Sequence, residues 1–205
     1  MNKRHVFWVL ATLSVAIAIV SYRFLVMGLP AAFPDFHSHN QLYLLLHVST
    51  APLALAFGVF QFSGRLRARL PKLHRVSGRI YALAILISGL SGLAISLGLD
   101  DRPVAGTGFG LLAIIWLAVT ANAIRLAVAR DLPRHREWML RSFALTLAAV
   151  SLRLQLPFLF IFGEMDYAEA SNIVAWTCWL PNILIAEWYI RATAGNKLVQ
   201  NANRF

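Results

Sequence analysis

Six apolar stretches, each about as long as a membrane is thick, limit what this chain can fold into. A helix needs about 20 apolar residues to cross the roughly 30 Å hydrocarbon core of a bilayer. The stretches are residues 6–29, 41–62, 79–99, 108–128, 138–162 and 171–190. Hydrophobic residues make up 59% of the 205 residues and charged residues 14%, which leaves no room for a soluble domain. The sequence therefore predicts an all-α bundle of six transmembrane helices, forming a single membrane domain over residues 1–205.

The charged residues divide the interhelical loops into two kinds. The loops before the third and fifth stretches are basic, whereas the other three carry acidic residues and only one cation, Arg102. The residues of the basic loops are Arg65, Arg67, Arg69, Lys72, Arg75, Arg79, Arg125, Arg130, Arg134, Arg136 and Arg141. Cytoplasmic loops are enriched in Lys and Arg, so this asymmetry predicts that both termini lie in the cytoplasm. The same asymmetry explains the net charge of +10. The expected partner is therefore the lipid bilayer, and no nucleic-acid partner is expected.

Two short segments combine proline, histidine and arginine where a basic loop meets an apolar stretch. Residues 71–79 read PKLHRVSGR and residues 133–141 read PRHREWMLR. Proline is favoured in the first turn of a helix, so both segments are expected to begin helices, with Asp131 capping the second.

The recurrence of these segments predicts an internal repeat. Their histidines, His74 and His135, lie 61 residues apart (135 − 74). The repeating unit would be a helical hairpin, over residues 41–99 and again over 108–162, with both copies running in the same direction.

The basic segments are the first candidate binding site. Free N–H groups at helix starts and guanidinium groups both suit an anion, so a small anion or an anionic lipid is the expected ligand. The candidate residues, at the cytoplasmic ends of the third and fifth helices, are His74, Arg75, Arg79, His135, Arg136 and Arg141. The alternative is that these arginines only fix the orientation of the helices and contact lipid phosphates.

A second candidate site lies in the opposite, outer half of the bundle. Arg23, His47 and Arg153 each fall well inside an apolar stretch, and Gln155 lies beside Arg153. An arginine within a span is costly and normally faces the bundle interior or a polar cavity. Prolines also interrupt the second, fifth and sixth stretches and free backbone carbonyls there; they are Pro52, Pro157 and Pro181. We therefore expect an outer-half polar pocket, while a histidine that simply bonds a freed carbonyl is the alternative for His47.

The sequence leaves the cofactor and any metal unknown, and haem b is the candidate that the histidines suggest. His47, or His74 together with His135, are the candidate ligands, but the paired histidines within spans that are usual in membrane cytochromes are missing. No pattern typical of a catalytic site is present, such as H-E-x-x-H or a nucleophile elbow. Binding or transport of an anion is therefore favoured over catalysis, with a haem-binding redox protein and an assembly or scaffold protein as the alternatives.

The order of these residues resembles a family of uncharacterised bacterial predicted integral membrane proteins. The resemblance rests on the paired motifs H-R-x-x-G-R-x-Y and H-R-x-W-M-x-R, together with His47, Gln61, Trp116 and Arg153. It covers about residues 41–160 and leaves out the first and last spans. It implies a multi-pass protein of the bacterial inner membrane, and it implies no activity, cofactor or catalytic residue.

Overall fold

Every regular element in the described part of the chain is a helix. The computed structural model describes residues 3–28 and 41–202, with side chains over 5–28 and 41–194. In chain order the helices are α1 (Lys3–Ser21), α2 (Phe24–Met27), α4 (Gln41–Phe60), α5 (Gly64–Arg69), α6 (Pro71–Leu97), α7 (Pro103–Val128), α8 (Leu132–Thr146), α9 (Ala148–Phe162), α10 (Tyr167–Thr177) and α11 (Leu180–Ala202). The predicted all-α fold is confirmed.

Six segments of the described residues are long and apolar enough to cross a membrane, as predicted. They are His5–Met27, Gln41–Phe60, Pro71–Leu97, Pro103–Val128, Leu132–Phe162 and Tyr167–Ala194. Four of them begin four or more residues before the apolar stretches of the sequence, because the first turns, with their polar residues, are helical as well. His74, Arg75 and Arg79 thus lie on α6 itself, where long side chains can reach a polar surface from within the helix.

Local signals in the sequence account for the helix starts. Prolines stand in the first turns of α6, α7 and α8, where their missing N–H costs nothing. The Asp131 side chain accepts a hydrogen bond from Arg134 N and caps α8, which confirms the predicted cap. Asp166 and Glu169 form a reciprocal capping box at the start of α10, so both polar groups satisfy free backbone donors.

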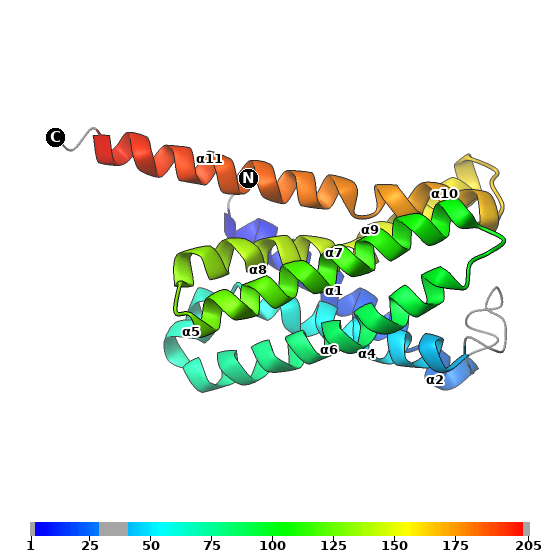
Figure 1. The fold of residues 1–205 in the computed structure, drawn as a ribbon, viewed down its shortest axis with the longest axis horizontal. Coiled ribbons are helices and arrows are strands. Elements are labelled where there is room, and N and C mark those ends of the chain that lie inside the picture. The colour runs from blue at the N-terminus through cyan, green and yellow to red at the C-terminus, as the bar shows by residue number, and fades with distance from the viewer. Residues whose placement is uncertain (1–2, 29–40, 203–205) are drawn as a thin grey trace.

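The bundle has two chemically different ends, which Figure 1 shows at left and right. At one end α4 runs through α5 into α6 and α7 joins α8; this basic end carries the cationic loops. At the other, acidic end, the α6–α7 connection holds Asp100 and Asp101, and the α9–α10 connection holds Glu164 and Asp166. Helix α6 packs between α4 and α7, and α7 also contacts α8 and α10.

Small residues on α6 bring three helices together. A Cβ at Gly92 would lie 3.1 Å from His47 Nδ1 of α4, and one at Gly89 would lie 2.7 Å from Leu117 of α7. Helices with small residues at the contact can approach closely. Gly92 therefore allows the close approach of α4 at His47, and Gly89 allows that of α7 at Leu117.

The fifth and sixth spans are each divided into two helices. Leu147 separates α8 from α9, and the α10–α11 junction lies just before Pro181. Pro181 is therefore in the first turn of α11 and does not bend a continuous helix, which corrects the interpretation of the sixth stretch as one kinked helix. The Thr177 carbonyl at this break accepts a hydrogen bond from Gln155 Nε2 at 3.2 Å, as a freed carbonyl in a membrane requires.

Candidate functional site

A cavity of about 470 Å³ extends from the acidic end into the middle of the bundle. Its walls come from α4, α6, α7 and α9, with contributions from α1, α8 and α10. The polar residues that line it are Ser21, Arg23, His47, Ser88, Ser96, Arg102, Thr146, Arg153, Tyr167 and Ser171. This volume lies within the range of small-molecule sites, which are mostly apolar with a few converging polar groups.

His47 is held against α6 in a fixed orientation. Its Nδ1 lies 2.8 Å from the Ser88 carbonyl oxygen, and because a carbonyl only accepts, Nδ1 carries the proton. The ring is also confined by Gly92, where any side chain would meet it. The other ring nitrogen, Nε2, is then a lone-pair acceptor in a residue that lines the cavity.

Both arginines that the sequence predicted for the pocket, Arg23 and Arg153, line the same cavity as His47. Arg153 Nη1 donates to the Ala149 carbonyl at 3.0 Å, so its side chain lies back along α9 towards the bundle centre. Arg23 lies close enough to Arg153, and Arg153 to His47, for their charges to interact. Gln155 does not line the cavity; its amide oxygen accepts from Thr177 Oγ1 at 2.7 Å and ties α9 to α10.

Arg102 joins this group and was not predicted. It precedes α7, is 8% exposed and lines the cavity. Its guanidinium carbon lies 5.3 Å from the centre of the Tyr167 ring, and its Nε lies 3.2 Å from Asp101 Oδ2. This ion pair lacks hydrogen-bond geometry at Nε, and Asp101 is itself exposed. A single cation in the otherwise acidic loops was the sequence signal that could have identified it.

The cavity lining is therefore one-sided in charge. Three arginines and one histidine line it, and none of the described lining residues is a carboxylate. Ser88 is fully buried, and its Oγ finds no hydrogen-bond partner within the described part of the chain. Arg102 is buried and Arg153 is half-buried, whereas Arg23 is exposed. Enclosed cations favour an anion, and they bind it more strongly than exposed cations would.

The basic end has a different arrangement of its predicted site residues. Arg75, Arg79 and Arg136 are exposed, whereas Arg141 forms a 2.9 Å ion pair with Glu187 of α11 and lies 5.1 Å from the Trp138 ring centre. Three of the four motif arginines are thus exposed, and the fourth is already paired with a carboxylate.

The two motif histidines lie at this end with unequal surroundings. His135 Nδ1 is 2.8 Å from the Ala123 carbonyl of α7, while His74 Nδ1 is buried with no hydrogen-bond partner among the described residues. His135 and Arg67 lie near enough to His74 to act on its charge. His47 belongs to the opposite half of the bundle and therefore does not pair with either of them.

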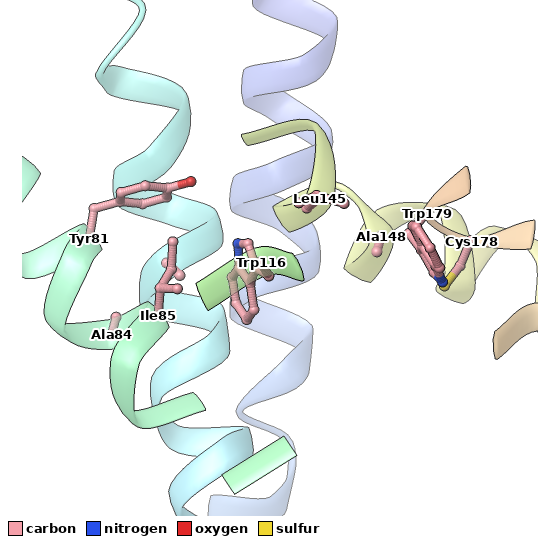
Figure 2. Packing of buried hydrophobic residues seen from close by; sticks show 9 residues of the cluster. Tyr81, Ala84, Ile85, Trp116, Leu145, Ala148, Cys178 and Trp179 are labelled. Carbon is pink, nitrogen blue, oxygen red and sulfur yellow. The ribbon is translucent and has the colours of Figure 1, made fainter. Parts of the chain in front are cut away.

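A buried network of hydroxyl groups forms part of the cavity floor. Tyr81 OH lies 2.8 Å from Ser142 Oγ and 3.0 Å from Thr146 Oγ1. Trp116 Nε1 donates to Thr146 Oγ1 at 3.0 Å, and Thr120 Oγ1 lies 2.7 Å from Ser142 Oγ. Figure 2 shows Tyr81, Trp116 and Leu145 of this region within the apolar core. Since every member is satisfied, the network stabilises one packing of α6, α7 and α8.

This network also joins the two sequence motifs. Tyr81 ends the first motif and Ser142 directly follows the second, and they are 61 residues apart (142 − 81), as are the two histidines. Equal spacing means that corresponding positions of the proposed repeat contact each other. Sequence reasoning missed this role, because a serine or tyrosine in an apolar stretch gives no sign of its partner.

Groups of three or more metal-ligating side chains are absent from the described residues. A haem would need only one or two histidines, and His47 satisfies part of that requirement: its Nδ1–H is bonded to a carbonyl, which fixes the ring with Nε2 as the available ligand atom.

Comparison with known protein families shows to which family this chain belongs. Residues 44–190 match the family described as "Predicted membrane protein (DUF2306)". The chain belongs to this family. The match extends through α10 and into α11, so the DUF2306 region includes the last span, which the 41–160 estimate had left out. No curated protein and no solved structure matches the chain. The DUF2306 description identifies a membrane protein and assigns it no molecular activity.

Proposed function

We propose that this DUF2306 protein binds or transports an anionic ligand, and that the ligand is held in the cavity by Arg153, Arg102 and Arg23. The observation that carries the proposal is the composition of the lining, with three arginines and His47 and no carboxylate among the described residues. An arginine side chain in a membrane protein needs a partner of opposite charge or water. A bound carboxylate or phosphate supplies that partner for Arg153, whose side chain donates to the neutral Ala149 carbonyl.

The cavity supports this function better than the basic end, where the sequence had placed the ligand. Exposed arginines are screened by solvent and gain little from an ion pair, and Arg75, Arg79 and Arg136 are all exposed. The cavity arginines are less solvated, apart from Arg23 at its edge. With the orientation expected from the charge asymmetry, the cavity opens on the outer side of a bacterial inner membrane, and the basic end faces the cytoplasm.

Benzoate binding to protein in neutral phosphatidylcholine nanodiscs tests the proposal, with calorimetry as readout. We expect Arg153→Gln to weaken binding at least tenfold, since a charge-assisted hydrogen bond contributes about 1.5–3 kcal/mol. Arg79→Gln is the matched control at the basic end and should leave the affinity within twofold. Equal affinities for Arg153→Gln and the wild type contradict the cavity as the site; loss in Arg79→Gln instead moves it to the basic end.

Haem binding is the second candidate, supported by the fixed orientation of His47 at the cavity wall. The cavity arginines would then pair with the propionates, and His47 would be an axial ligand. An absorption spectrum of protein purified from haem-replete cells tests this. A Soret band that His47→Ala removes supports a haem protein; a colourless protein, or a band that His47→Ala leaves unchanged, contradicts His47 as the ligand.

A further inference from the structure

The cavity has a charged region and an apolar region at different depths. Arg153 on α9 marks the charged level, and His47 on α4 also lines this part of the cavity. Two leucines line the same cavity deeper in the bundle. Leu55 comes eight residues after His47, and Leu145 comes eight residues before Arg153. By helix rise, eight residues correspond to about 12 Å. A space of this length therefore lies between the charged groups and the deepest lining residues.

The walls of this deeper space are apolar. They include Phe109, Leu112 and Ala113 of α7, facing Ala148 of α9. Below them the cavity ends at Trp116 and the buried hydroxyl network, which packs into the main core. In Figure 2 Trp116 lies among Ile85, Leu145 and Ala148 and fills the centre of the view. The floor is thus closed by large side chains that hydrogen bonds hold in place.

We infer that the anion is the head of an amphiphile whose apolar body occupies this deeper space. The inference rests on the proposed function, since it takes Arg153 as the group that binds the head. From the level of His47 to that of Leu55, which line the cavity on the single helix α4, the body has room for about 12 Å, the length of about nine extended methylene groups. The ligand class is a medium-chain carboxylate or alkyl phosphate.

Different residues are expected to contact the two ends of such a ligand. Arg153 interacts with the charge and is indifferent to chain length. Ala113, which is 6% exposed and faces the cavity, limits the length of the body and is indifferent to the charge. Ala118 on the same helix is exposed and provides a matched position outside the cavity.

The test is a chain-length series of saturated carboxylates from two to sixteen carbons, measured by calorimetry in neutral nanodiscs with empty nanodiscs as the blank. Wild-type affinity should rise about fourfold per methylene, reach a maximum near nine or ten carbons, and fall for longer chains. Ala113→Leu should move the maximum to a shorter chain by two or three carbons, and Ala118→Leu should leave it in place. Leu112→Ala provides a second variant and should move the maximum to longer chains, so the inference stays testable if Ala113→Leu does not fold.

Each result separates the inference from the proposed function. Arg153→Gln should weaken all chain lengths by the same factor and leave the position of the maximum unchanged. If Arg153→Gln weakens binding but the affinity does not depend on chain length, the amphiphile is wrong and the anion site stands. A length maximum that survives Arg153→Gln at full affinity overturns the anion site. A wild type that binds no member of the series overturns both.

A parallel series of alkyl phosphates distinguishes the two possible heads. The series with the tighter wild-type binding at equal chain length identifies the head. The chain length of tightest binding should differ between the two series by no more than the difference in size between the two head groups. A larger difference contradicts a cavity floor fixed by Trp116.

Discussion

The acidic-end cavity and the basic end use the same kinds of side chain in opposite surroundings. At the basic end the arginines are numerous, and Arg75, Arg79 and Arg136 are exposed. In the cavity the cations are few, and Arg102 and Arg153 are enclosed by apolar helices. A high density of arginines in the sequence therefore indicates how the helices are oriented in the membrane. The candidate site is found instead where the fold encloses arginines.

The largest expected effect comes from reversing the charge of one arginine in the cavity and of one at the basic end. Arg153→Glu places a carboxylate beside Arg23 and His47, and we expect it to reduce anion affinity more than 100-fold, because an attraction becomes a repulsion at low dielectric. Arg79→Glu at the basic end should change the affinity less than twofold. Calorimetry with benzoate in neutral nanodiscs measures both. Similar losses in the two variants would show that the whole positive field, and not the cavity, binds the ligand.

A second test separates stabilising cations from binding ones. Arg141→Gln removes the 2.9 Å pair with Glu187, which joins α8 to α11, and should lower the free energy of unfolding by about 1–2 kcal/mol. Its control is Arg134→Gln, which removes the exposed 3.6 Å pair with Asp131 and should cost about 0.5 kcal/mol or less.

Thermal unfolding in detergent gives both values, and a double-mutant cycle with Glu187→Gln isolates the pair. A coupling energy near zero would show that Arg141 is free to bind a ligand, which would favour the basic end.

The hydroxyl network between the two ends gives a smaller effect. Tyr81→Phe removes the hydroxyl that contacts Ser142 and Thr146, and we expect a loss of about 1 kcal/mol in unfolding free energy. Tyr22→Phe is the control, since its single bond to the Ser49 carbonyl is outside the network. Equal losses in the two variants would mean that the network adds nothing beyond one ordinary hydrogen bond.

The smallest effect is expected for the exposed motif arginines. Arg75→Gln and Arg136→Gln should each change the unfolding free energy by less than about 0.5 kcal/mol and leave benzoate affinity within twofold. The measurements are again thermal unfolding and calorimetry. A loss of binding in the double variant with unchanged stability would restore the basic end as the anion site.

The hydrophobic pattern was sufficient for the fold class and for the number of spans. It placed four helix starts four or more residues too late, because a window of apolar residues excludes polar first turns such as that of α6. It also missed the α10–α11 break. Proline is compatible with either a kink or a helix start, and the packing of α10 against α7 and α9 is a tertiary property.

The candidate site was predictable in part, for a physical reason. An arginine or histidine inside an apolar stretch is expensive in a bilayer, so Arg23, His47 and Arg153 were identifiable without coordinates. Arg102 gave only a weaker signal, as the single cation of the otherwise acidic loops, because a loop cation carries no such cost in the sequence. Its burial arises only when Tyr167 and the start of α7 enclose it.

By itself, then, the sequence determined that the chain is a six-span helical membrane protein and which of its charges are costly, since both follow from the transfer of side chains between water and lipid. Only the tertiary structure decided which of those charges share one cavity, that Arg141 is neutralised by Glu187, and that Tyr81 and Ser142 join the two motifs. Those are contacts between helices far apart in the chain, and a one-dimensional pattern does not specify how helix faces meet.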